Sequence, residues 1–218
     1  MKTKIVCMGD SITEGFMVEE WENYPTKLGK LLGEDYEVIN KGQCSTCVLN
    51  IETKEGLMGI PYVRQDRYKE ALEEKGDIYL IMLGTNDAQD GMDDVDDIVY
   101  PLFNMISRKE HFKEHYLRII EDIQRTNHAA KIYVCLPIPV QKCIWRKHKE
   151  EYLADLREIM KEMVAEKEDL NLIDVYGAFA ALPIEEQLSL YREDMLHPNS
   201  KGYDLLAETI FKNLHKVY

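Results

Sequence analysis

The sequence predicts an α/β protein, a three-layer α/β/α sandwich built around a five-stranded parallel sheet. Three observations lead to this prediction: short apolar runs alternate with amphipathic stretches, the runs are apolar at successive positions, and no repeat, low-complexity tract or linker interrupts them. Successive apolar residues are typical of parallel strands that are covered on both faces. Strands and helices in alternation imply right-handed crossovers, with helices layered on the sheet. We therefore expect one domain that spans residues 1–218.

The expected strands are rich in β-branched or large apolar residues and are bounded by Gly, Asp, Asn or Pro. They cover residues 4–8, 36–39, 78–83, 132–136 and 170–173. Helical patterns cover residues 24–32, 108–126, 149–167 and 201–216. Ser107 stands three residues before Glu110, a capping-box spacing that predicts the start of the second helix. Asn199 or Ser200 is expected to cap the last one.

Two segments, residues 41–65 and 84–107, show no clear period. Both leave expected strands at their carboxyl ends, which is the edge of a doubly wound sheet where ligands bind. Long loops in a compact domain are often functional. We expect these two segments to border the ligand site.

Composition excludes several classes of protein. A chain of 218 residues can bury a sizeable core without disulfides or metals to hold it together. Its net charge of −13 leaves no basic stripe to neutralise phosphates, so nucleic acid is not an expected partner. No stretch approaches the roughly 20 apolar residues of a membrane span, so no membrane partner is expected. Composition leaves open whether the chain forms a homo-oligomer.

The cysteine count and the first residues favour a cytoplasmic protein. The chain has 5 cysteines, an odd number that fits reduced thiols better than a disulfide framework. Its first residues reach a turn at Gly9 without the apolar run of a secretory signal. A chain from which a leader had been removed would look the same.

The first chemical motif is Gly9-Asp10-Ser11, which follows the first expected strand directly. Glycine gives the backbone freedom for a sharp exit, and Ser11 then presents a hydroxyl beside free backbone N–H groups. Taken alone, the triplet favours a simpler interpretation, in which Asp10 or Ser11 caps a helix.

The second motif is Asp194-x-x-His197, near the other end of the chain. A serine hydroxyl needs an imidazole to take its proton, and a carboxylate orients that imidazole. A spacing of three residues lets Asp194 reach the Nδ1–H of His197 while Nε2 faces elsewhere. Taken alone, this pair too is more simply a capping Asp and a surface His.

Two further motifs lie at expected strand ends. Asn86, in Gly84-Thr85-Asn86-Asp87, carries an amide that could donate a hydrogen bond to an oxygen that becomes negative during acyl transfer. Gly42 follows the second strand, and its N–H could donate into the same space. Each of these signals is weak by itself.

Taken together, the four motifs resemble the SGNH (GDSL-type) hydrolases. Residues 9–15 (Gly-Asp-Ser-Ile-Thr-Glu-Gly), Gly42, residues 84–87 and Asp194-x-x-His197 match the four sequence blocks of that family in order and approximate spacing. The resemblance spans residues 4–215, and four ordered blocks are far more specific than one motif. It implies a flavodoxin-like sandwich.

The resemblance also implies roles for individual residues. Ser11 would be the nucleophile, His197 its general base and later the acid that protonates the leaving alcohol, and Asp194 the group that orients His197. The oxyanion hole would consist of the N–H groups of Ser11 and Gly42 and the amide of Asn86. The resemblance implies no metal and no organic cofactor.

Three features depart from the family pattern. Gly42 is followed by Gln-Cys-Ser-Thr-Cys, where relatives often continue with Ser-Gly or another small pair. Met195 occupies a position that is frequently glycine in relatives, and residues 88–107 match no subfamily pattern. None of these departures removes a catalytic atom.

For the substrate, residues 9–15 with Asn23-Tyr24-Pro25 resemble bacterial carbohydrate and sialate O-acetylesterase-like members. This resemblance implies a small-molecule ester, an acetyl group on a sugar. Candidate substrate-binding residues are Asp10, Trp21, Tyr62, Arg64 and Trp145, although buried aromatics and a surface Arg are common without such a role. A lysophospholipase or acyl-thioesterase is the alternative enzyme, and it would need an apolar groove for a long chain.

Two interpretations from other classes stay open. A catalytically silent module could use the same crevice to bind a ligand. Alternatively, Cys44-x-x-Cys47, joined by Cys135 and Cys143, could form a metal or redox site, although Cys135 fits a core position better. The acidic run 87–97 lacks the order of an EF-hand and is more typical of a solvated loop.

Overall fold

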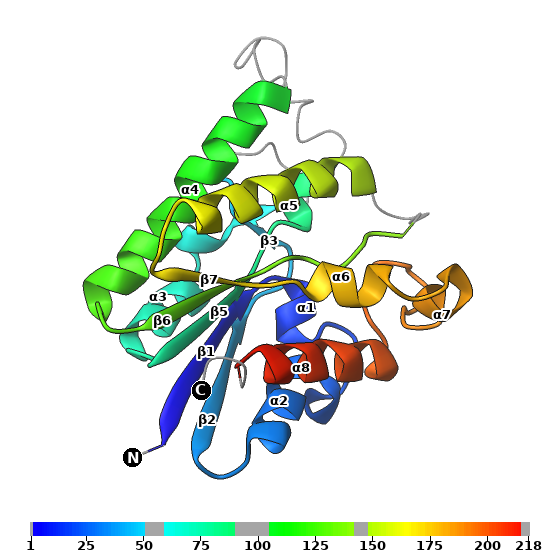
Figure 1. The fold of residues 1–218 in the computed structure, drawn as a ribbon, viewed down its shortest axis with the longest axis horizontal. Coiled ribbons are helices and arrows are strands. Elements are labelled where there is room, and N and C mark those ends of the chain that lie inside the picture. Colours follow the sequence, from blue (N-terminus) through cyan, green and yellow to red (C-terminus); the bar gives the residue numbers. More distant parts are fainter. Residues whose placement is uncertain (1, 51–58, 90–104, 142–147, 215–218) are drawn as a thin grey trace.

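A computed structural model gives the fold of the chain and describes residues 2–50, 59–89, 105–141 and 148–214. Five parallel strands form the central sheet in the order β2-β1-β5-β6-β7 (Figure 1). Their bounds are β1 Thr3–Gly9, β2 Tyr36–Gly42, β5 Ile78–Met82, β6 Lys131–Cys135 and β7 Leu170–Ile173. All five strands lie where the apolar runs predict them, and the three-layer α/β/α sandwich is confirmed.

The chain adds β2 on one side of β1 and then β5, β6 and β7 on the other side, so the order of strands switches at β1. The register pairs Gly9 of β1 with Gly42 of β2 and with Met82 of β5, so the three strands end at one level. Loops that leave these strands therefore emerge side by side. This is the point in a doubly wound sheet at which ligands bind.

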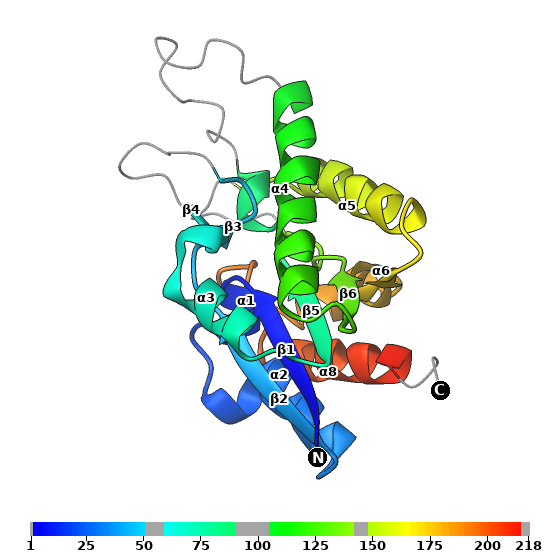
Figure 2. The same ribbon diagram turned by 90° about the vertical axis from the view of Figure 1, so that its left-hand side faces the viewer.

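Side chains of each strand alternate between two apolar layers, because successive residues in a strand face opposite sides. Val6 and Met8 of β1 belong to the layer beneath α3 (Asp66–Glu73), α4 (Met105–Thr126) and α5 (Glu150–Ala165). Ile5 and Cys7 belong to the opposite layer, beneath α2 (Tyr24–Leu32) and α8 (Ser200–Leu214). Figure 2 shows these two groups of helices on either side of the sheet.

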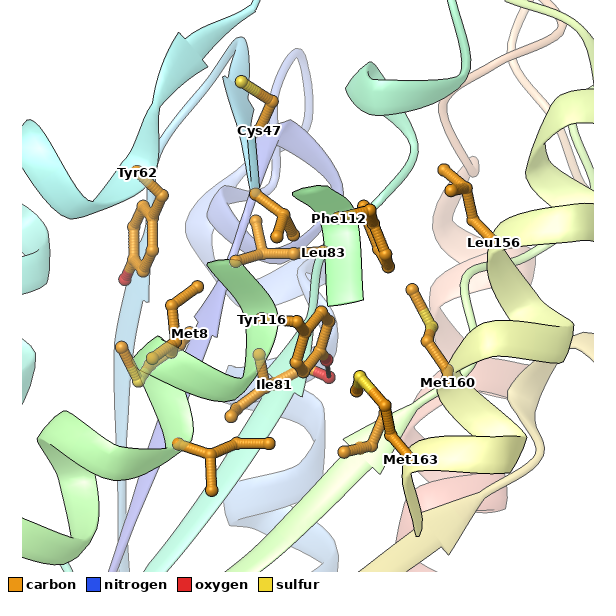
Figure 3. Close-up of a cluster of buried hydrophobic side chains, with 14 of the residues drawn as sticks. Met8, Cys47, Tyr62, Ile81, Leu83, Phe112, Tyr116, Leu156, Met160 and Met163 are labelled. Carbon is orange, nitrogen blue, oxygen red and sulfur yellow. Dashed lines mark hydrogen bonds between the residues drawn. The ribbon is translucent and has the colours of Figure 1, made fainter. Parts of the chain in front are cut away.

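The first layer is filled largely by aromatic, aliphatic and Met side chains. Figure 3 shows Phe112 and Tyr116 of α4 lying opposite Met160 and Met163 of α5. The two rings pack at 5.7 Å between centroids, and the Tyr116 hydroxyl donates to the Ile81 carbonyl of β5 at 3.2 Å. This packing fixes α4 and α5 on the sheet from which the site residues project.

The long helices agree with their predicted positions, and α2 has the predicted bounds. One detail is wrong: α4 begins at Met105, so Ser107 lies inside the helix and is not its N-cap. Asn199 does cap α8, because its Oδ1 accepts from the N–H groups of Lys201 at 3.0 Å and Gly202 at 3.2 Å.

Several short elements lacked a periodic signal. They are α1 Ser11–Glu14, the 3₁₀ turns η1 Glu20–Glu22, η2 Tyr62–Arg64 and η3 Asn86–Ala88, helices α6 Val175–Ala180 and α7 Ile184–Leu188, and strands β3 Thr46–Cys47 and β4 Ile60–Pro61. Helix α3 was also not predicted, since its eight residues span little more than two turns. Of the helices in the described ranges, none is long and apolar enough to cross a membrane.

Candidate active site

Ser11 lies at the carboxyl end of β1, on the first turn of α1. Asp10 caps this helix, its Oδ1 accepting from the Ile12 N–H at 2.9 Å, which leaves Ser11 as the first helical residue. The N–H of such a residue has no acceptor within its helix. The sequence suggested that Gly9 lets the backbone turn sharply after β1, but the structure gives a different reason for glycine. A Cβ there would lie 2.0 Å from the Thr13 hydroxyl, so glycine permits the close approach of α1.

Residues 194–197 form a tight turn that holds the histidine ring. Asp194 Oδ1 accepts from the backbone N–H groups of Leu196 at 3.1 Å and His197 at 2.9 Å. Met195, between them, has a left-handed backbone with φ of 55°. Glycine adopts this conformation without strain, so the turn explains why glycine would suit the position.

The structure brings Ser11, His197 and Asp194 into one chain of hydrogen bonds. His197 Nε2 lies 2.9 Å from the Ser11 Oγ, and His197 Nδ1 lies 2.6 Å from Asp194 Oδ2. His197 is fully buried, and the Phe16 ring packs against it at 5.1 Å between centroids. Ser11 and His197, which are 186 positions apart in the sequence, are thus in direct contact.

The Asp194 carboxylate is held in its ionised form. Burial alone would raise its pKa, but the hydrogen bonds from the His197 ring and from the N–H groups of His197 and Leu196 outweigh burial and lower the pKa. An ionised Asp194 accepts a hydrogen bond from the Nδ1–H of His197, and in a neutral imidazole the lone pair then lies on Nε2, facing the Ser11 hydroxyl.

Asn86 lies buried at the end of β5, on the turn η3. Its Nδ2 donates to the Thr46 carbonyl at 2.8 Å, and its Oδ1 lies 3.2 Å from His148 Nε2. An amide nitrogen carries two hydrogens. One of them is used by Thr46, and the other has no partner among the described residues.

Gly42 ends β2 beside α1, and a Cβ at this position would lie 2.2 Å from the Glu14 nitrogen. Its N–H, predicted to donate to the oxyanion, donates instead to Asn40 Oδ1 at 2.9 Å in this structure. Three residues later, Ser45 has a left-handed backbone with φ of 62°. The Ser45 N–H forms no hydrogen bond with another described residue.

The turn that contains Ser45 is fixed between β1 and Asn86. The Gln43 N–H donates to the Gly9 carbonyl at 3.0 Å, and the Thr46 hydroxyl lies 2.7 Å from the Gln43 carbonyl and 3.3 Å from the Gly9 carbonyl. The Thr46 carbonyl accepts from Asn86. Residues 43–46 therefore lie between the strand that leads to Ser11 and the amide of Asn86.

Three site-supporting residues were missed by sequence reasoning. Asp87 is fully buried, and its carboxylate accepts from the N–H groups of Val48 at 3.0 Å and Leu49 at 2.8 Å. Gln89 donates to the Asn86 carbonyl at 2.9 Å, and His148 contacts the Asn86 amide. Asp87 belongs to a motif that was recognised, whereas His148 stands in a segment without any pattern.

A cavity of about 520 Å³ lies beside Asp194. It is lined by Met17, Tyr191, Arg192, Glu193, Asp194 and Asn199. Met17 is the one aliphatic side chain among the described lining residues, and it is exposed. The cavity therefore offers polar groups and one small apolar surface beside Asp194.

The predicted substrate residues lie in different environments. Tyr62 is fully buried and donates to the Lys41 carbonyl at 2.5 Å, so it belongs to the core and not to a binding surface. Asp10 is also buried, where it caps α1, so its predicted contact with substrate is not supported. Trp21 is 60% exposed, and Arg64 is exposed and donates to Asn50 Oδ1 at 2.6 Å. Trp145 lies outside the described residues.

The cysteines do not assemble a metal centre within the described ranges. Cys7, Cys44, Cys47 and Cys135 are free thiols, and no group of three or more potential metal ligands occurs among the residues the structure describes. Cys143 lies outside these residues. Burial raises the pKa of Cys7 to about 12, which makes this thiol unreactive.

The sequence model of the GDSL-like lipase/acylhydrolase family matches residues 7–205. Over 217 residues the chain is 29% identical to an acetylxylan esterase of Xylanibacter ruminicola, a match that covers 95% of this chain. The chain spans only 42% of the length of that relative.

Two solved structures share the fold. The lipase/acylhydrolase of Enterococcus faecalis superposes with a TM-score of 0.70 at 23% identity, covering 98% of this chain and 95% of that one. A GDSL-like lipase of Bacteroides thetaiotaomicron superposes with a TM-score of 0.65 at 17% identity, covering 99% of this chain and 89% of that one. At these identities the likeness extends to the fold alone.

Proposed function

The chain belongs to the GDSL-like lipase/acylhydrolase family, and we propose that it is a serine esterase that removes an acetyl group from a carbohydrate. One observation carries the proposal: Ser11 Oγ, His197 and Asp194 are joined by contacts of 2.9 and 2.6 Å. A hydroxyl, an imidazole and a carboxylate in this order form the arrangement that activates a serine for acyl transfer.

In the proposed reaction, Ser11 Oγ attacks the ester carbonyl carbon while its proton passes to His197 Nε2. The imidazolium that forms is stabilised by the Asp194 carboxylate, whose pKa is lowered by its hydrogen bonds. The tetrahedral intermediate collapses when the carbonyl–alcohol bond breaks and His197 returns the proton to the leaving alcohol. An acyl group then remains on Ser11.

The second half of the reaction reverses these roles. Water gives a proton to His197 Nε2 and attacks the acyl carbon, and Ser11 Oγ leaves and recovers the proton. The products are the free acid and the original enzyme. No step needs a group other than those of the chain and water.

The negative oxygen of each tetrahedral intermediate needs hydrogen-bond donors. We assign the N–H of Ser11 and the second amide hydrogen of Asn86 to this role, together with a main-chain N–H from residues 42–45. Within that segment the observations favour Ser45, because the Gly42 N–H donates to Asn40. Ser45 precedes Thr46, the residue that accepts from the Asn86 amide.

Three observations support a short acyl group on a sugar. The curated relative, at 29% identity, is an acetylxylan esterase. The cavity beside Asp194 is lined mainly by polar side chains, which suits a hydroxyl-rich alcohol better than a lipid tail. Exposed Trp21 offers an aromatic face for a sugar ring.

A panel of esters tests the proposal. Acetate release from acetylated xylo-oligosaccharides and peracetylated monosaccharides would be compared with hydrolysis of p-nitrophenyl acetate, butyrate and octanoate. We expect acetyl esters to react fastest. A preference for octanoate, or for an acyl-thioester, would replace the substrate assignment by the lysophospholipase or thioesterase alternative.

Ser11→Ala is the control for the chemistry. We expect this variant to lose activity by at least ~10⁴-fold and to lose labelling by a fluorophosphonate. If the unmodified chain is not labelled and hydrolyses esters no faster than Ser11→Ala or buffer alone, the result would instead favour a binding module without catalytic activity.

A further inference from the structure

We propose that His148 is a positioning residue that holds the Asn86 amide with its nitrogen toward the substrate. His148 is 7% exposed and Asn86 is 2% exposed, and the contact between His148 Nε2 and Asn86 Oδ1 is 3.2 Å long. This inference rests on the proposed function, because it concerns the donor that Asn86 supplies to the oxyanion.

The orientation of the Asn86 amide follows from the groups on its two sides. The Thr46 carbonyl, 2.8 Å from one end, can only accept a hydrogen bond, so the Asn86 nitrogen must face it. The oxygen therefore faces His148. Because an amide oxygen can only accept, the hydrogen of this contact must be carried by His148 Nε2.

A reversed amide would be unfavourable because its oxygen would lie against the Thr46 carbonyl oxygen. Its N–H₂ group would face His148 Nε2, which could accept only if the ring hydrogen moved to the buried Nδ1. The same reversal would turn an oxygen, in place of a donor, toward the negatively charged intermediate. The Thr46 carbonyl thus sets the orientation in which Asn86 can stabilise that intermediate, and the Nε2–H of His148 holds the amide oxygen in place on the other side.

Backbone contacts hold His148 in register with Asn86. Gln89 and His148 form an antiparallel bridge, and the Lys149 N–H donates to the Ala88 carbonyl at 2.9 Å. The Gln89 side chain also donates a hydrogen bond to the Asn86 carbonyl at 2.9 Å. These contacts join residues 86–89 to residues 148–149 and hold the His148 ring next to the Asn86 amide.

A double-mutant cycle tests the inference on the ester that the enzyme hydrolyses fastest. His148→Phe removes the donor and keeps a ring, and we expect kcat to fall about tenfold with KM little changed. His148→Gln keeps an N–H donor at similar reach and should restore most of kcat. In the background of Asn86→Ala, His148→Phe should cause no further loss, since its effect passes through Asn86.

His128→Phe is the matched control, since it makes the same substitution at an exposed histidine before β6, at the opposite end of the sheet from Asn86. It should leave kcat unchanged. Thermal unfolding would verify that the variants fold, and His148→Leu would replace His148→Phe if the latter does not.

The outcomes separate this inference from the proposed function. If Asn86→Ala lowers kcat by about 10²–10³ but His148→Phe has no effect, or has an equal effect in both backgrounds, the positioning role is overturned while the esterase proposal stands. Full activity of Ser11→Ala would overturn the esterase proposal itself.

Discussion

The two halves of the site are built by different means. On the serine side, which comprises Ser11, Asp194 and His197, each side chain is oriented by its own short turn. Asp10 caps α1 beside Ser11, and Asp194 accepts from the N–H of His197 three residues later. On the amide side, which comprises residues 42–46, 86–89 and His148, Asn86 is held by Thr46, 40 residues away, and by His148, 62 residues away.

This difference between local turns and long-range contacts explains which half of the site can be recognised from the local sequence. A short turn has a fixed spacing, so Asp194-x-x-His197 specifies most of its own geometry. The amide side instead depends on contacts between loops that meet only after the sheet has formed. We expect substitutions on the serine side to affect mainly the chemistry, and those on the amide side to affect folding and chemistry together.

The largest expected effect is on the serine side. Asp194→Asn should lower kcat by about 10⁴-fold, because an asparagine can donate to Nδ1 and favour the wrong tautomer of His197. The free energy of unfolding should change much less. Kinetics with a matched unfolding curve would check both, and a loss of less than tenfold would contradict the role of Asp194.

The second prediction concerns Asp10, whose pKa is raised from 3.8 to about 7 because burial outweighs the hydrogen bond from the Ile12 N–H. Between these values the folded state keeps a proton that the unfolded chain has released, so stability falls as the pH rises from about 4 to 7. Asp10→Asn should abolish this dependence, which amounts to at most about 4 kcal/mol.

Urea unfolding at pH 4, 5.5 and 8 would measure the effect as the difference in free energy between the variant and the unmodified chain. A difference that does not change with pH would show that Asp10 is not protonated in the folded state. Asp194 gives the opposite sign, since its lowered pKa makes its contribution to stability disappear as the pH falls through that pKa.

The third prediction separates structure from chemistry on the amide side. Gly42→Ala places a Cβ 2.2 Å from the Glu14 nitrogen, which is backbone and cannot move aside easily. We expect a loss of about 3 kcal/mol in the free energy of unfolding. Urea unfolding would measure this loss, and a variant as stable as the unmodified chain would contradict the prediction.

The smallest effect is expected at Asp87, whose carboxylate accepts from Val48 and Leu49. Asp87→Asn keeps one acceptor oxygen and turns an N–H₂ group toward the other N–H, which should cost about 1–3 kcal/mol. Faster hydrogen exchange at Val48 and Leu49, measured against Ile5 in β1, would detect the change. Unaltered exchange at both amides would contradict the proposed anchoring.

Sequence patterns predicted the five strands and four long helices well, because buried strands and amphipathic helices repeat their apolar residues at characteristic intervals. They failed for α3 and for the start of α4, where the pattern is short or the cap signal lies inside the helix. Among candidate binding residues, Tyr62 and Asp10 are buried. A loop residue gives no sign in the sequence of whether it faces the core or the solvent.

The sequence by itself determined the fold class, the family and the residue types of the serine side, because apolar periodicity and short turns act over neighbouring residues. Only the tertiary structure decided that Ser11 lies 2.9 Å from His197, that the Gly42 N–H is taken by Asn40, and that His148 reaches Asn86. These contacts join segments that become neighbours when parallel strands align their carboxyl ends, or side chains that fold back on their own strand. Local sequence patterns do not encode such distances.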